Sequence, residues 1–271
     1  MDYSVQTVLL AFGFTLIAGL STGIGAALAF FTRKTNTKFL SLALGFSAGV
    51  MIYVSFIEIF QKARTSLSEV AGAYWGTIYA VIGFFGGIAI IAIIDKLIPD
   101  VENPHEMHKI EEIKQSIDTS SPDLMRMGLF AALAIGIHNF PEGFATFMSA
   151  LKDPKLGVAI TTAIAIHNIP EGIAVSVPIY YATANRSKAF WLSTLSGIAE
   201  PVGAAIGFLI LRQFMTDYVF GFSFAAVAGI MVFISLDELL PAAQRYGEHH
   251  LSIYGLISGM AIMALSLIMF L

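Results

Sequence analysis

The residues best suited to chemistry in this chain form a short motif that occurs twice. The sequence reads HNFPEG at 138–143 and HNIPEG at 167–172, which is 29 residues later (167 − 138). In a helix, residues four positions apart share a face, so the histidine and the glutamate of each copy point the same way, and the asparagine is turned about a quarter of the way round. The six candidate metal ligands are His138, Asn139, Glu142, His167, Asn168 and Glu171.

Imidazole, amide and carboxylate groups together form a nitrogen and oxygen ligand set. Such a set suits Zn²⁺, Fe²⁺, Mn²⁺, Co²⁺ and Ni²⁺, whereas a site of oxygen alone would indicate Mg²⁺ or Ca²⁺. The proline at the fourth position of each copy has no N–H to donate, so we expect it to kink or locally unwind its helix. The carbonyl that this frees, close to the histidine, could help to line an ion site.

Both copies of the motif lie near the middle of apolar stretches that are long enough to cross a bilayer, and a third such stretch carries Glu200 near its centre. An ionisable residue inside a membrane span is costly and by default indicates a functional site. A lone buried histidine or glutamate more often joins helices by hydrogen bonds or relays protons. Two matched copies together with Glu200 favour metal binding instead.

The composition agrees with a membrane protein. Of the 271 residues, 56% are hydrophobic and only 13% are charged, whereas a soluble domain carries about 25% charged residues because its surface faces water. The chain has no cysteine, which excludes disulfides and thiolate metal sites. Its formal net charge of −4 gives no reason to expect a nucleic acid partner.

Eight stretches contain the roughly 20 apolar residues that a helix needs to span the hydrocarbon core. We therefore predict an all-α polytopic membrane protein, one transmembrane domain over residues 1–271. A hydrophilic loop over 99–125 separates the third span from the fourth. The first span is long enough to cross the bilayer, so we expect it to be retained in the membrane and not cleaved as a signal peptide. The eight predicted helices cover 5–31, 40–60, 74–98, 126–150, 155–182, 188–211, 219–241 and 252–271.

The distribution of lysine and arginine predicts the orientation in the membrane. Ten of these residues lie in one set of loops and five in the opposite set. Because cytoplasmic loops are enriched in lysine and arginine, we expect both termini outside and the 99–125 loop inside, in the plasma or inner membrane.

Consecutive spans run antiparallel, so two motif copies at equal depth would be related by a two-fold axis in the membrane plane. Inverted symmetry about a midplane site is common in secondary transporters. Glycines four residues apart also recur, a spacing that lets helices pack closely in lipid, although glycine is common in membrane helices generally. They describe packing, either between helices of one chain or in a homodimer contact, and are Gly19/Gly23, Gly45/Gly49, Gly83/Gly87, Gly203/Gly207 and Gly255/Gly259.

Further predictions concern polar residues near the ends of the spans and in the loops. Acids near the ends of predicted spans could relay a metal along a pathway or could simply meet water: Glu58, Asp95, Asp237 and Glu238. Residues of the long loop and of the last loop could hold metal loosely, but we favour an interpretation as solvated loop residues: Glu102, His105, Glu106, His108, Glu111, Glu112, His249 and His250.

Two other function classes are open at this point. An intramembrane metallohydrolase would also bury metal ligands, but it normally shows an HExxH pair, and none occurs in the sequence. A cation channel needs a continuous polar pathway, whereas the polar groups here gather at mid-depth in three spans. We therefore predict a transporter that is not an enzyme, holds no resident cofactor and carries divalent metal across the bilayer.

With HNFPEG and HNIPEG in adjacent spans, the chain resembles the ZIP (Zrt/Irt-like) metal transporters, in particular their bacterial zinc-uptake branch, which is ZupT- or GufA-like. The resemblance covers essentially the whole chain, and the doubled motif is specific in this context. It implies a 3+2+3 bundle, in which spans one to three repeat, inverted, as spans six to eight around the fourth and fifth. It also implies uptake into the cytoplasm, of zinc above all, with Fe²⁺, Mn²⁺, Co²⁺ and Cd²⁺ as further candidates.

The resemblance further implies a two-metal centre. One ion would bind His138, Glu142, His167 and Glu171, and the second would bind Asn139, Glu142, Asn168, Glu171 and Glu200, with the two shared glutamates bridging. It also places Asp95, Asp237 and Glu238 near the cytoplasmic exit. Some members carry glutamine and aspartate where this chain has His167 and Asn168, so the metal preference of those members does not transfer to it.

Overall fold

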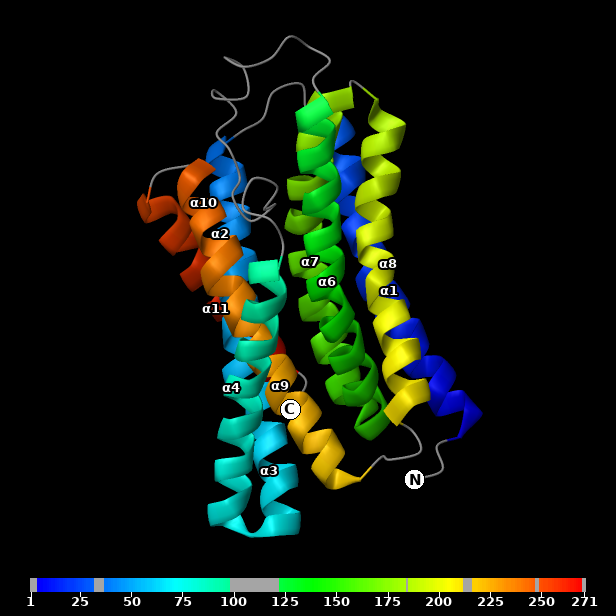
Figure 1. The fold of residues 1–271 in the computed structure, drawn as a ribbon, viewed down its shortest axis with the longest axis vertical. Coiled ribbons are helices and arrows are strands. Elements are labelled where there is room, and N and C mark those ends of the chain that lie inside the picture. Colours follow the sequence, from blue (N-terminus) through cyan, green and yellow to red (C-terminus); the bar gives the residue numbers. More distant parts are fainter. Residues whose placement is uncertain are drawn as a thin grey trace.

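Helices make up every regular element in the part of the chain that the structure describes (Figure 1). This computed structural model describes residues 4–31, 37–97, 122–183, 185–211, 216–246 and 249–269. The predicted all-α class is confirmed for these residues. Most of the predicted 99–125 loop lies outside them, including Glu102, His105, Glu106, His108, Glu111 and Glu112.

The helices follow the apolar stretches of the sequence closely. They are α1 (Val5–Phe31), α2 (Thr37–Val54), α3 (Phe60–Ala71), α4 (Ala73–Leu97), α6 (Pro122–Lys152), α7 (Pro154–Thr183), α8 (Arg186–Leu211), α9 (Asp217–Ile234), α10 (Leu240–Tyr246) and α11 (His249–Met269). Within the described ranges, seven segments are long and apolar enough to cross a membrane, and they match seven of the eight predicted spans. The predicted span at 126–150 is helical, inside α6, but α6 is not among those seven.

Two of the seven candidate spans are continuous helices that contain a π-helical turn. The turn η1 (Ser55–Ile59) joins α2 to α3, and η4 (Ser235–Leu239) joins α9 to α10. Their sequences, SFIEI and SLDEL, both begin with a buried serine and carry a glutamate at the fourth position, and SLDEL has an additional aspartate at the third. A π turn inserts one residue and rotates the helix that follows, and such turns occur frequently at functional sites. Hydrophobic periodicity alone did not predict either turn.

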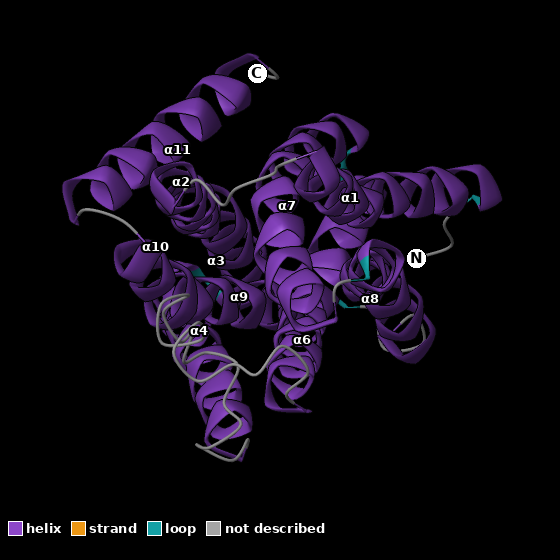
Figure 2. Ribbon diagram, turned by 90° about the horizontal axis from the view of Figure 1, so that it is seen from above, coloured by secondary structure: helices purple, strands orange, loops and turns teal. Residues whose placement is uncertain are grey.

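The helices form two groups, which separate clearly in Figure 1. In the first group, α1 and α6 each pack along both α7 and α8. In the second group, α2 packs along α11 and α4 packs along α9, while α3 contacts α4 and α9. The groups meet where α2 contacts α7 and where α6 contacts α9, a junction seen from above in Figure 2.

Close approaches between helices depend on glycine. Gly19 of α1 and Gly197 of α8 face each other, so that a Cβ on either would overlap the backbone oxygen of the other. A Cβ on Gly25 would likewise overlap the carbonyl oxygen of Ile169, inside the second motif copy. All five predicted glycine pairs lie close to the backbone or side chains of a neighbouring helix, which supports the packing interpretation: Gly19/Gly23 face α8, Gly45/Gly49 face α11, Gly83/Gly87 face α9, Gly203/Gly207 face α6 and Gly255/Gly259 face α2.

Replacing Gly25 with alanine should destabilise the protein, because the new methyl group would meet backbone atoms of Ile169 that cannot move aside. The matched control is Gly13→Ala on the same helix, where a Cβ meets nothing within 4 Å and helix propensity gains up to about 1 kcal/mol. Thermal unfolding of the purified protein in detergent should show a lower midpoint for Gly25→Ala and an unchanged or higher midpoint for Gly13→Ala. Equal midpoints for the two variants would contradict close packing at Gly25.

Candidate metal centre

The two copies of the repeated motif lie on adjacent helices of the first group. The first copy is in α6 and the second in α7, and these helices pack along each other. Both helices continue through their motif prolines, Pro141 and Pro170. The predicted local unwinding is therefore not observed, because neighbouring helices hold the α6 and α7 backbones in place on both sides of each proline. The missing proline N–H still leaves one carbonyl in each preceding turn without its helical hydrogen bond.

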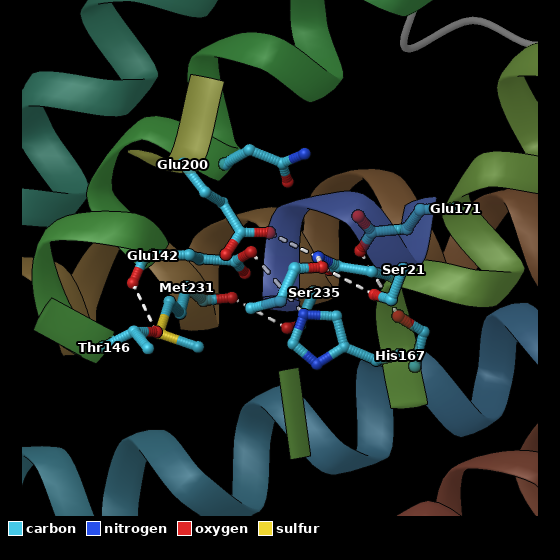
Figure 3. A network of polar contacts seen from close by, with 12 residues as sticks. Ser21, Glu142, Thr146, His167, Glu171, Glu200, Met231 and Ser235 are labelled. Carbon is cyan, nitrogen blue, oxygen red and sulfur yellow. Dashed lines mark hydrogen bonds and ion pairs between the residues drawn. The ribbon is translucent and has the colours of Figure 1, made fainter. Parts of the chain in front are cut away.

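Six of the seven predicted mid-membrane residues have side chains that the structure describes, and all six are completely buried: Asn139, Glu142, His167, Asn168, Glu171 and Glu200. The side chain of His138 lies outside the described part of the chain. Buried charged groups are stabilised only when they are paired or bind an ion. The structure thus brings the polar residues of α6, α7 and α8 together in one interior cluster, as Figure 3 shows.

Two contacts connect the helices that supply this cluster. Nε2 of His167 lies 3.5 Å from Oε2 of Glu142, which joins the second motif copy to the first (Figure 3). Asn168 donates a short hydrogen bond from Nδ2 to Oε1 of Glu200, which joins α7 to α8. The histidine and glutamate of different copies therefore face each other, whereas the sequence paired them within one copy.

The two motif asparagines are held in the same way. Nδ2 of Asn168 donates to the carbonyl of Ala18 in α1 at 2.9 Å, and Nδ2 of Asn139 donates to the carbonyl of Ser196 in α8 at 3.2 Å. With the amide nitrogen fixed on a neighbouring backbone, each amide oxygen is directed away from that backbone. The asparagines can therefore present oxygen ligands in a fixed orientation.

Several buried oxygens in the cluster accept no hydrogen bond from the described residues: Oδ1 of Asn139 and Asn168, Oε1 of Glu142 and Oε2 of Glu200. A buried polar atom without a partner costs about 1–3 kcal/mol, and more when it is charged. Buried acceptors of this kind can be satisfied by a bound cation. Among the described side chains, however, no three histidine, aspartate or glutamate residues are already arranged to hold one ion. The ligand sets therefore remain a prediction.

Ser47 is a member of the cluster that the sequence did not indicate. Its hydroxyl, on α2 in the second group, donates to Oε1 of Glu171 at 3.4 Å, so one carboxylate is shared between the two groups of helices. A serine in a membrane helix usually bonds to its own backbone, so its type and position gave no signal. Only the contact between α2 and α7 identifies it.

The acids predicted near span ends lie on other elements. Glu58 is in η1 and forms an ion pair with Lys62 at 3.7 Å. Asp95 is partly buried near the end of α4, and Asp237 and Glu238 are exposed and partly buried in η4. A pathway role for these four remains a prediction. His249 and His250 begin α11 and are exposed to solvent, so they lie in a helix where the sequence suggested a loop.

Comparison with known proteins finds a matching family and full-length relatives. Residues 99–267 match the family described as ZIP Zinc transporter. A zinc transporter ZupT of Lysinibacillus sphaericus is 65% identical, over 97% of this chain and 98% of that relative. Proteins of the same name from Streptococcus mutans (62% identical, 98% and 99% covered) and Nitratidesulfovibrio vulgaris (61% identical, 97% and 98% covered) are equally full-length relatives.

The matches extend over the buried cluster and over nearly all of the helices around it. Together with the seven membrane-length apolar helices among the described residues, they make this a multi-pass integral membrane protein. The resemblance drawn from the doubled HN-x-PEG motif is thus confirmed. The chain belongs to the ZIP zinc transporter family.

Proposed function

We propose that this protein carries zinc into the cytoplasm, and with it other divalent transition metals such as Fe²⁺, Mn²⁺, Co²⁺ and Cd²⁺, through a two-metal site at mid-membrane. The observation that carries the proposal is the fully buried cluster on α6, α7 and α8, in which imidazole, carboxylate and amide groups meet. Nitrogen and oxygen donors of this kind suit these metals. Relatives over the full length of the chain are named zinc transporters, which agrees with it.

In the proposed site, Glu142 and Glu171 bridge two ions. One ion binds His138 and His167 as well, and the other binds Asn139, Asn168 and Glu200. Three features support this assignment: His167 already faces Glu142, Glu200 already contacts Asn168, and both asparagine oxygens accept no hydrogen bond from the described residues. An arriving ion would exchange its water for these ligands.

We further propose α6 as the eighth span and the whole as a 3+2+3 inverted repeat. The 31 residues of α6 extend over about 46 Å at 1.5 Å per residue, which exceeds the hydrocarbon core. Matched contacts support the repeat. Ala18 and Ser196, which hold the two asparagines, and Gly19 and Gly197, which face each other, are 178 residues apart (196 − 18 and 197 − 19). The π turns with their matching sequences fall in spans two and seven.

Movement of one helix group against the other would expose the site to each side in turn. The cluster lies in the first group, next to the junction with α2 and α9 of the second. The hydrogen bond from Ser47 to Glu171 crosses this junction and would have to break during such a movement. In the proposed orientation Glu58 lies towards the outside, and Asp95, Asp237 and Glu238 lie towards the cytoplasmic exit.

Zinc uptake into sealed proteoliposomes tests the site directly. The double variant Glu142→Gln with Glu171→Gln keeps the shapes of the side chains but removes both bridging charges, so saturable uptake should fall to the level of protein-free vesicles. The matched control is Glu69→Gln, an exposed acid in α3, which should leave uptake unchanged. Saturable uptake in a correctly inserted double variant would contradict transport through the paired motif.

Zinc uptake should also depend on pH. Histidine and carboxylate must be deprotonated to bind metal, so protons compete with the ion. Uptake at a fixed free zinc concentration, with equal pH on both sides of the membrane, should rise several-fold between about pH 5.5 and pH 7.5, the range in which histidine loses its proton. A flat profile across this range would contradict histidine ligation.

The proposed orientation can be tested with single cysteines, because the chain has none of its own. With both termini outside, Glu69→Cys should react with a membrane-impermeant maleimide on intact cells, whereas Lys188→Cys should react only after the membrane is opened. Both positions are exposed in the fold, so access is limited by the membrane and not by burial. Labelling in the reverse order would place the termini in the cytoplasm.

A further inference from the structure

Thr22 of α1 is completely buried, and its hydroxyl makes no hydrogen bond within the described part of the chain. Two other buried threonines donate to the carbonyl four residues earlier, Thr15 to Ala11 at 3.0 Å and Thr146 to Glu142 at 2.9 Å, whereas the buried hydroxyl of Thr161 in α7 also makes no hydrogen bond within the described residues. At Thr22 that acceptor would be the carbonyl of Ala18, which already accepts from Asn168 at 2.9 Å and from Ser21 at 2.6 Å. The Thr22 hydroxyl is therefore left for another partner.

The packing of Thr22 matches that of Glu200. Gly143 of the first motif copy packs on the backbone of Glu200, and Gly172 of the second copy packs on the backbone of Thr22. Asn139 is held by the carbonyl of Ser196, four residues before Glu200, and Asn168 is held by the carbonyl of Ala18, four residues before Thr22. Thr22 thus occupies the same position relative to α7 that Glu200 occupies relative to α6.

This correspondence indicates where the hydroxyl lies. Glu200 reaches across the cluster to Asn168. By the same relation we infer that Thr22 lies on the Asn139 side of the cluster. Its hydroxyl packs beside Gly197 of α8, next to Ser196, whose carbonyl holds Asn139. Oδ1 of Asn139 is buried and, like the Thr22 hydroxyl, makes no hydrogen bond within the described residues. Two buried oxygens without hydrogen bonds on the same side of the cluster favour a cation near them.

We propose that Thr22 supplies a neutral oxygen to the coordination shell of the transported ion on the Asn139 side, in contact with the ion or with one of its waters. This assignment rests on the proposed function. It gives the centre three carboxylates, Glu142, Glu171 and Glu200, where a symmetric centre would have four. Two divalent ions would then be incompletely neutralised, which favours release of metal over permanent retention.

The test compares Thr22→Val, which keeps the shape and removes the hydroxyl, with Thr22→Ser, which keeps the hydroxyl and removes the methyl group. Thr15→Val is the matched control, a buried threonine on the same helix. Zinc binding to the purified protein is measured by titration, and zinc uptake in proteoliposomes is resolved into KM and kcat. Thr22→Val should weaken binding at one of the two sites and raise KM about 5- to 20-fold, as expected for a lost ligand contact. Thr22→Ser and Thr15→Val should stay within about twofold of the unaltered protein.

A packing role for Thr22 would reverse this order, since loss of the methyl group would harm Thr22→Ser while the isosteric valine would bind and transport normally. That result, with intact zinc binding by the unaltered chain, would overturn the Thr22 assignment alone. Failure of the unaltered chain to bind or transport zinc would overturn the proposed function as well. The unfolding midpoint of metal-free Thr22→Val should not fall, because an unsatisfied buried hydroxyl has been removed; a lower midpoint would also count against the assignment.

Discussion

The desolvation of ionisable side chains within membrane-length helices is the constraint on which the rest of this structure depends. Glu142, Glu171, Glu200 and His167 are completely buried in a protein whose outer surface faces lipid, and carboxylates in such a place are costly unless they are paired or bind an ion. The helices must therefore approach closely enough for these groups to meet. Glycine makes this possible where α1 crosses α8 and where α6 and α8 meet beside Glu200.

The cluster lies beside the junction between two groups of helices, and this position connects binding to movement. Ser47 of α2 donates to Glu171, so a site carboxylate is shared across the junction. Counted from the matching π turns, the position of Ser47 in α2 corresponds to Val227 in α9, which is buried and offers no hydrogen bond. The two motif copies thus meet the second group differently. Metal binding at Glu171 would compete with a contact that holds the two groups together, which suits a transporter whose bundles move relative to each other.

The two motif copies are matched in how their asparagines are held but differ in the charge of the residue packed beside them. The matched backbone contacts of Asn139 and Asn168 orient two amide oxygens in the same way, which favours a site with ligands on both sides. The packing counterpart of Glu200 is Thr22, a neutral side chain. If Thr22 contributes as proposed, a neutral oxygen takes the place of a fourth carboxylate, and two bound divalent ions would not be fully neutralised. The proposed centre would thus combine symmetric positioning of its ligands with an asymmetric charge.

The sequence by itself determined the helical class, the bounds of most spans and six of the residues that gather in the buried cluster, because apolar length and ionisable residues in mid-span are local features. It also identified the family, through the doubled motif. The tertiary structure decided what depends on contacts between distant segments: His167 faces Glu142 of the other copy, Ser47 reaches Glu171, and Ala18 and Ser196 hold the two asparagines. It also decided that α6 and α7 continue through their prolines and that η1 and η4 interrupt two spans. Periodicity records which face of a helix is apolar, but only packing determines which neighbour that face meets.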